Sequence, residues 1–171
     1  MSEKQRLNRK EIEELASNAL IASGALGTSA KSLAKAVASA EMDGIKSHGL
    51  VYVPIYCEHL LCGKVVGSAV PKVERPAKGA VVVEACSGFA HPAIDAGFSD
   101  LVPAAKERGC AGMSIRNSYN CGVLGHHVER LAESERKMRD ILVNLPVIVA
   151  RFDKTKGGKI QFLNMAWSRI L

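Results

Sequence analysis

The sequence Asp43-Gly44-Ile45-Lys46-Ser47-His48-Gly49 lies between two helical patterns and organises the first part of the chain. Two glycines interrupt the helices here, and a histidine directly follows a serine. A loop between rigid elements points its side chains in defined directions, and such loops often carry binding or catalytic residues. Two interpretations of His48 stay open. It is either a reactive imidazole, or a histidine in a glycine-rich helix connection that is merely exposed or hydrogen-bonded to a neighbour.

Upstream of this loop, two amphipathic helices are predicted. Asn8 and Glu11 have the spacing of a capping box at the start of the first helix. The apolar residues that follow recur with helical periodicity: Ile12, Leu15, Ala16, Ala19 and Leu20. A second helix is expected from Thr28 or Ser29 to the residue before Gly44. The residues of its inward face are Leu33, Val37 and Ala40.

Downstream of the loop, a third helix is predicted. Its apolar face consists of Leu50, Val53, Cys57, Leu60 and Leu61. Gly63 ends this helix, and Pro54 fits only in its first turn because proline has no backbone N–H to donate. Residues 64–79 are then typical of a loop or an edge strand. Three helices are therefore expected to meet near His48.

A strand, a helix and a strand follow, and together they have the size of a βαβ unit. Ala80-Val81-Val82-Val83 is typical of a buried strand, residues 92–108 of a helix and residues 111–115 of a second strand. The turn Cys86-Ser87-Gly88-Phe89-Ala90-His91 lacks the glycine spacing of a Rossmann fingerprint. The fold class predicted for residues 1–133 is α/β, with an N-terminal helical cluster packed on a βαβ unit.

The formal net charge of the 171 residues is +6, but it is unevenly distributed. Residues 1–133 carry 15 basic and 14 acidic side chains, whereas residues 134–171 carry 8 and 3. The first segment therefore gives no reason to expect a nucleic-acid partner. No apolar run reaches the roughly 20 residues that span a bilayer, so no membrane partner is expected and the cytoplasm is the expected location. The five cysteines and five histidines lack zinc-site spacing, so no metal is predicted.

The composition changes near residue 134. A helix is predicted from about residue 124 to residue 133, and a charged helical start follows from Ser134. Residues 146–152 and 159–163 are typical of two strands joined by a hairpin loop. A single hairpin with short helices is marginally stable by itself. Residues 134–171 are therefore expected to be the opening part of a second, α+β domain.

Several short motifs in residues 8–133 have an order and spacing that match a known enzyme family. They are Asp43-Gly44-Ile45-Lys46-Ser47-His48-Gly49, Pro54-Ile55-Tyr56, Gly63-Lys64-Val65, Gly88-Phe89-Ala90, Ala105-Lys106-Glu107-Arg108-Gly109, Arg116-Asn117-Ser118 and Gly125-His126-His127. With these motifs the segment resembles the N-terminal part of the type 2 malate/L-lactate dehydrogenase family. The resemblance implies a non-Rossmann α/β fold, a homodimer and NAD or NADP as cofactor. It also implies small 2-hydroxy acids, 2-keto acids or cyclic imino acids as substrates.

The resemblance assigns roles to individual residues. It implies that His48 donates or accepts a proton, which suits imidazole because its pKa lies near working pH. The candidate substrate contacts are Ser47, Tyr52 and Asn120, and the candidate cofactor contact is Ser118. Tyr52 stands where the family usually has an arginine. The resemblance therefore implies that a neutral hydroxyl, and not a positively charged guanidinium, is available to the substrate carboxylate. Asn120 stands where the family often has a histidine, and an amide orients a carbonyl without transferring a proton.

The resemblance ends near residue 133, before the part of the family's sequence that supplies most cofactor contacts. Weak turnover or none is therefore expected from these 171 residues alone. Residues 134–171 resemble the start of a PAS sensory domain through Asn144-Leu145-Pro146-Val147, Gly158-Lys159-Ile160 and Trp167. Two alternatives to an oxidoreductase follow from this second resemblance. One is a sensory or ligand-binding signalling fragment with a pocket lined by Phe162, Met165 and Trp167, and the other is an inert fusion fragment.

Overall fold

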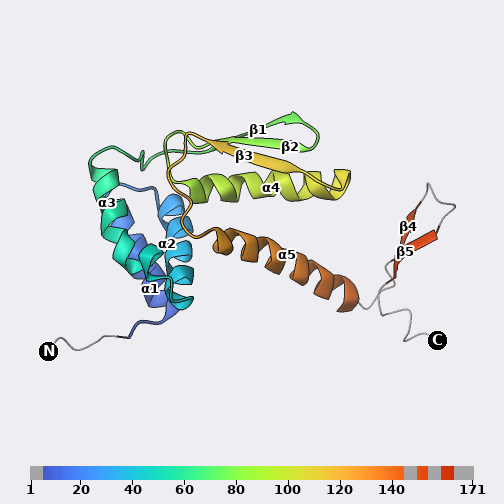
Figure 1. The fold of residues 1–171 in the computed structure, drawn as a ribbon, viewed down its shortest axis with the longest axis horizontal. Coiled ribbons are helices and arrows are strands. Elements are labelled where there is room, and N and C mark those ends of the chain that lie inside the picture. The colour runs from blue at the N-terminus through green and yellow to red at the C-terminus, as the bar shows by residue number, and fades with distance from the viewer. Residues whose placement is uncertain (1–5, 145–149, 154–158, 164–171) are drawn as a thin grey trace. The chain divides into compact units, whose positions relative to one another are not determined.

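The computed structural model describes residues 6–144, 150–153 and 159–163. The chain divides into two compact units, Met1–Leu124 and Gly125–Leu171, and each is described by itself. The larger unit combines a cluster of helices with a small sheet (Figure 1). This arrangement confirms the predicted α/β class for the first part of the chain.

Three helices form the helical cluster of the larger unit: α1 (Arg9–Ala22), α2 (Gly27–Met42) and α3 (Val53–Leu61). The predicted capping box at the start of α1 is confirmed. The Asn8 side chain accepts from the Glu11 N–H at 3.0 Å, and the Glu11 carboxylate accepts from the Asn8 N–H at 2.7 Å. Helix α2 begins at Gly27, slightly earlier than predicted. Pro54 lies in the first turn of α3, as its missing N–H requires.

Helix α2 supplies much of the core of this cluster. Leu33, Val37 and Ala40 are all buried, as predicted. The prediction was wrong for Leu15 and Leu61, which are 53% and 74% exposed. The buried row of α1 consists of Ile12, Ala16 and Leu20. At 3.6 residues per turn, Leu15 lies about 100° around the helix from the middle of that row, and Leu61 about 100° from the buried Leu60.

The sheet of the larger unit has three strands in the order β1 (Lys72–Ala77), β2 (Ala80–Glu84) and β3 (Gly112–Arg116). Strand β1 is antiparallel to β2, and β2 is parallel to β3. Helix α4 (Ala90–Arg108) connects the two parallel strands and runs along one face of the sheet (Figure 1). The predicted βαβ unit and edge strand are thus both confirmed. Pro103 is accommodated within α4 at an exposed position.

The smaller unit contains one long helix and a hairpin. Helix α5 (Leu124–Asn144) continues through residue 133, where two separate helical segments were predicted. No glycine or proline interrupts residues 126–144, so nothing local ends the helix earlier. Strands β4 (Ala150–Asp153) and β5 (Lys159–Leu163) pair antiparallel, which confirms the predicted hairpin.

Part of the predicted second domain lies outside the described residues. These parts are residues 146–149 of the first predicted strand and the pocket candidates Met165 and Trp167. The PAS-like resemblance therefore stays a prediction. Within the described part of the chain, no helix is both long and apolar enough to cross a membrane.

Candidate active site

The segment that carries His48 consists of two single 3-10 turns, Lys46–His48 and Leu50–Tyr52, between α2 and α3. The His48 N–H donates to the Ile45 carbonyl at 3.1 Å, and the Tyr52 N–H donates to the Gly49 carbonyl at 3.0 Å. These hydrogen bonds define the backbone of the segment. Its last residue directly precedes α3, so a helix start fixes the direction of the Tyr52 side chain.

A carboxylate from the end of α2 holds this segment in place. Glu41 Oε1 accepts a hydrogen bond from the Leu50 N–H at 2.7 Å. Gly49 is buried, and a Cβ at that position would collide with the Glu41 carboxylate. Sequence reasoning missed Glu41, because the contact forms only after the chain reverses direction beyond α2.

The predicted pair Ser47 and His48 makes a direct contact. Ser47 Oγ lies 3.0 Å from His48 Nδ1, with Ser47 exposed and the His48 ring half-buried. A histidine oriented through one ring nitrogen has the other available for proton transfer. The contact therefore leaves His48 Nε2 as the nitrogen for a reacting group.

Tyr52 lies beside this imidazole and connects it to the protein interior. The rings of Tyr52 and His48 are stacked, with centroids 6.2 Å apart and planes 11° from parallel. Tyr52 in turn meets the edge of Tyr56 at a centroid distance of 4.8 Å. Tyr56 is buried, and its burial, followed by the neighbouring Tyr52 and Tyr119, raises its pKa far above the usual value. Tyr56 therefore stays a neutral hydroxyl at every physiological pH.

Asn120, the predicted substrate contact in the loop between β3 and α5, joins the same cluster through Tyr56. The Tyr56 hydroxyl donates to Asn120 Oδ1 at 3.5 Å, and the Gly122 N–H donates to the same oxygen at 3.2 Å. Tyr119 precedes Asn120 and is anchored by its backbone N–H, which donates to the Gly88 carbonyl at 2.9 Å. The structure thus brings the two predicted segments, residues 47–52 and residue 120, to one region of the larger unit.

Two further side chains of this region, Tyr119 and His59, were not singled out from the sequence. His59 Nδ1 lies 2.5 Å from the Tyr119 hydroxyl oxygen. Burial, followed by a hydrogen bond to Tyr52, raises the pKa of Tyr119 to about 12. The local signal that was available for His59 is its spacing from Tyr56, which places the two rings three residues apart on α3, with Tyr52 at the N-cap of that helix.

Ser118, the candidate cofactor contact, is exposed in the loop between β3 and α5. The neighbouring turn between β2 and α4 is where nucleotide-binding folds often hold a phosphate. Here the Cys86 N–H donates to the Glu84 carboxylate at 2.8 Å and lowers the pKa of that carboxyl. The Ser87 N–H donates to the Asn117 carbonyl at 2.7 Å. Both amides are used within the protein, so neither is available to a dinucleotide phosphate.

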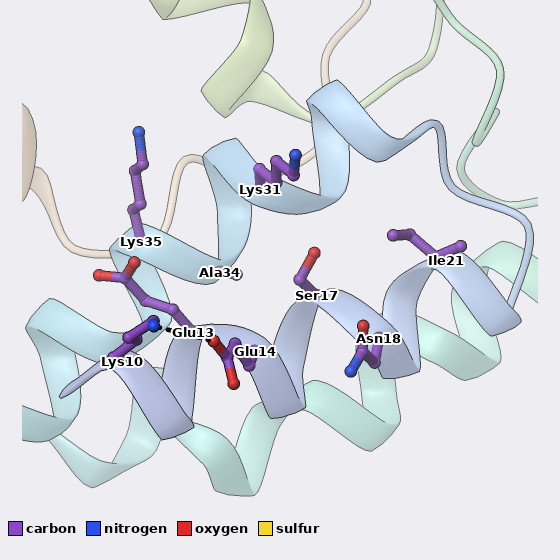
Figure 2. Close-up of a pocket in the computed structure, with 9 residues that line it drawn as sticks. All are labelled: Lys10, Glu13, Glu14, Ser17, Asn18, Ile21, Lys31, Ala34 and Lys35. Carbon is purple, nitrogen blue, oxygen red and sulfur yellow. Dashed lines mark ion pairs between the residues drawn. The ribbon is translucent and has the colours of Figure 1, made fainter. Parts of the chain in front are cut away.

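A separate hollow of about 330 Å³ lies between α1 and α2 (Figure 2). Nine residues line it: Lys10, Glu13, Glu14, Ser17, Asn18, Ile21, Lys31, Ala34 and Lys35. The Lys10–Glu14 pair at 3.7 Å is largely exposed, as expected of a solvated helix surface. The hollow shares no residue with the His48 segment. Across the described residues there is also no group of three or more His, Cys, Asp or Glu side chains that could hold a metal ion.

The sequence model of the family described as malate/L-lactate dehydrogenase matches residues 7–150. A (2R)-3-sulfolactate dehydrogenase (NADP(+)) of Chromohalobacter salexigens is 41% identical over 127 residues, which are 74% of this chain and 38% of that protein. A delta(1)-pyrroline-2-carboxylate/delta(1)-piperideine-2-carboxylate reductase of Pseudomonas syringae pv. tomato is 44% identical over 101 residues, 59% of this chain and 29% of that protein.

The fold is similar to that of solved structures as well. The crystal structure of delta1-piperideine-2-carboxylate reductase from Pseudomonas syringae pv. tomato matches with a TM-score of 0.74 and 37% identity. The match covers 77% of this chain and 40% of that one. The chain thus spans less than half the length of each of these relatives.

Proposed function

The chain belongs to the malate/L-lactate dehydrogenase family, and from this premise we propose that it functions as an NAD(P)-dependent oxidoreductase. The proposed substrates are small 2-hydroxy acids, their 2-keto counterparts or the corresponding cyclic imino acids. The observation that carries the proposal is the Ser47–His48 contact at 3.0 Å with Tyr52 stacked on the same imidazole. A proton carrier and a hydroxyl donor side by side suit the reduction of a carbonyl or imine next to a carboxylate.

In this proposal, His48 is the proton donor in the reducing direction. NADH or NADPH supplies the hydride when it is bound. As the carbonyl oxygen gains negative charge, protonated His48 gives it a proton from Nε2, and in the oxidising direction neutral His48 removes it. Ser47 keeps the ring oriented through Nδ1. No step is assigned to Cys86 and Ser87 of the turn between β2 and α4, because their N–H groups are already bonded within the protein.

Tyr52 and Asn120 are the proposed substrate contacts. The Tyr52 hydroxyl donates to the carboxylate, and the Asn120 amide orients the carbonyl or imine. A neutral hydrogen bond contributes about 1 kcal/mol, whereas a hydrogen bond from a charged group contributes roughly 1.5–3 kcal/mol. Substrates are therefore held more weakly than by an arginine at the position of Tyr52. Ser118 stays the candidate cofactor contact because it is exposed on the neighbouring loop.

The test is reduced-nicotinamide consumption by the purified chain with pyruvate, other 2-keto acids and delta(1)-pyrroline-2-carboxylate. NADH and NADPH are compared. Any turnover should be slow, and His48→Ala should abolish it while Ser47→Ala reduces it. His59→Ala is the matched control, because it also removes a histidine but leaves the proposed proton donor His48 in place. It should not abolish turnover. Turnover that survives His48→Ala would exclude His48 as the proton donor.

A second candidate function is ligand sensing by residues 134–171. The antiparallel pairing of β4 with β5 is compatible with the opening hairpin of a sensory domain. Phe162 belongs to β5, and the other two proposed pocket residues, Met165 and Trp167, lie outside the described residues. A small molecule that co-purifies with the chain and is lost in Trp167→Ala would support this function over the oxidoreductase.

The proposed assembly is a homodimer, as in the family that the sequence resembles. Multi-angle light scattering coupled to size-exclusion chromatography tests it. A single species at twice the mass of 18.3 kDa is expected. Particles that grow with concentration would instead support the inert fusion fragment, because unpartnered apolar surface promotes such association.

A further inference from the structure

We propose that His59 is a positioning residue for the candidate substrate contact Asn120. Its ring binds the Tyr119 hydroxyl and so attaches the loop between β3 and α5 to α3, and Lys64 keeps the ring in the tautomer that donates. The inference deepens the proposed function and rests on it for the role of Asn120. The contact that carries it joins residues 60 positions apart in the sequence.

Helix α3 presents two side chains to this loop, Tyr56 and His59, which lie three residues apart and so share one face of the helix. His59 Nδ1 lies 2.5 Å from the Tyr119 hydroxyl oxygen. The Tyr56 hydroxyl reaches Asn120 Oδ1 only at 3.5 Å, the limit of hydrogen-bond length. The shorter contact, at Tyr119, is therefore the one that holds this part of the loop against α3.

The Tyr119 ring transmits the attachment because it is held on several sides. Its centroid lies 6.1 Å from that of Tyr56 and 6.0 Å from that of Phe89, both in edge-to-face contact. Aromatic pairs of this kind have a preferred geometry. The Tyr119 backbone N–H donates to the Gly88 carbonyl at 2.9 Å. Tyr119 is thus fixed at its ring, its hydroxyl and its backbone, and Asn120 follows it directly in the chain.

Lys64 determines which nitrogen of His59 carries the proton. Lys64 Nζ lies 3.5 Å from His59 Nε2, and an ammonium group can only donate. Nε2 is therefore the acceptor, and in the neutral ring the proton resides on Nδ1, which faces Tyr119. The backbone returns Lys64 to this ring because Gly63 turns the chain with a φ of 75°, a conformation that glycine adopts without steric cost. The Val65 N–H then donates to the His59 carbonyl at 3.0 Å.

Hydrogen bonds within the loop determine which end of Asn120 is available to a ligand. The Gly122 N–H can only donate, so the Asn120 atom 3.2 Å from it is the side-chain oxygen. The neutral Tyr56 hydroxyl donates to the same oxygen. Asn120 is exposed, and with its oxygen occupied, its NH₂ group is the part that a substrate carbonyl oxygen can meet. Holding the loop therefore holds a donor for the substrate.

The first experiment measures how firmly the loop is held in the full chain, without cofactor or substrate. The Gly122 amide reports on the loop, because its N–H donates to Asn120 Oδ1. His59→Phe should speed hydrogen exchange at this amide about fivefold, the effect of one typical hydrogen bond. The Val65 amide is the internal control, because it donates to the backbone carbonyl of residue 59 and not to its side chain. Unchanged exchange at Gly122, or an equal rise at both amides, would overturn the inference.

Two amide substitutions at position 59 distinguish positioning from the simple loss of a polar side chain. In His59→Asn, the side-chain N–H lies near the place of Nδ1. In His59→Gln, the longer side chain carries its N–H to the place of Nε2. His59→Asn should therefore restore slow exchange at Gly122, and His59→Gln should not. Restoration by both variants, or by neither, would overturn the assignment of Nδ1 as the donor to Tyr119.

Two-bond proton–nitrogen NMR spectra read the tautomer of His59 directly. In the full chain the neutral ring should carry its proton on Nδ1. Lys64→Met should give a mixture of tautomers, because Nε2 is then free to hold the proton. Lys78→Met, at an exposed lysine of the turn between β1 and β2, is the matched control and should leave the ring unchanged. A proton on Nε2 in the unaltered protein would overturn the inference.

Tyr119→Phe is the second variant if His59→Phe does not fold, because it removes the same hydrogen bond and keeps the ring. It should speed exchange at Gly122 to a similar extent. Nicotinamide consumption separates the inference from the proposed function. In an active chain, kcat/KM for pyruvate should fall about fivefold in His59→Phe and recover in His59→Asn. The expected exchange and tautomer without any turnover would count against the oxidoreductase alone, and turnover with an Nε2-protonated His59 would overturn the positioning role alone.

Discussion

The contact between Glu41 and the backbone of Leu50 should contribute measurably to the stability of the larger unit. At 2.7 Å it is a hydrogen bond between a carboxylate and an N–H in a partly buried position. Such hydrogen bonds contribute about 2 kcal/mol, so Glu41→Ala should lower the free energy of unfolding by about that much. In a domain of this size the expected decrease in Tm is roughly 8 °C. Urea denaturation followed by circular dichroism measures the free energy, and Glu58→Ala, at an exposed glutamate of α3, is the control.

Gly49 allows a sharper test of the same contact. An alanine Cβ at position 49 would collide with the Glu41 carboxylate, and the three nearest atoms it would meet all belong to the Glu41 side chain. Gly49→Ala should therefore displace Glu41 and cost about 2 kcal/mol. In the Glu41→Ala background the same substitution should cost much less, because the obstacle is gone. A double-mutant cycle should thus give a coupling of about 2 kcal/mol, and additive effects would refute the proposed anchoring.

Three further predictions concern the hydroxyl of the half-buried Tyr119, the sheet and the first helix. Because the pKa of Tyr119 is about 12 in the fold and 10.0 is its ordinary value, the unfolded chain loses its proton first, and stability should fall as pH rises between these values. Urea denaturation against pH should show a smaller fall in Tyr119→Phe, and an equal fall in both proteins would contradict the assignment. Gly97→Ala should cost about 1–3 kcal/mol in the same assay, because a Cβ there would collide with Met113 and separate α4 from the sheet; unchanged stability would show that the two layers adjust freely. Asn8→Ala should cost about 1 kcal/mol through loss of the capping box, whereas Asn8→Asp should retain most of the stability.

The elements of the larger unit could be predicted from the sequence because their signals are local. The Asn8–Glu11 capping box, the position of Pro54 and the β-branched run at residues 80–83 each act within a few residues of themselves. Local signals also gave the βαβ unit and the hairpin of β4 and β5. They did not give the orientation of every apolar side chain. Leu15 and Leu61 are exposed because burial depends on which neighbouring helix covers each face.

The candidate site likewise has a part that local sequence signals predicted and a part that only the tertiary fold assembles. Ser47, His48 and Tyr52 lie within six consecutive residues, so two short turns and a helix start were enough to place them together. Asn120, Tyr119 and His59 are joined only by the tertiary fold, since the Tyr119–His59 contact spans 60 residues of sequence. The anchoring Glu41 also depends on a chain reversal that no local pattern encodes. The sequence by itself therefore determined the pairing of His48 with Ser47, whereas packing of the loop that carries Tyr119 and Asn120 against α3 decided which hydroxyls and amides lie near them.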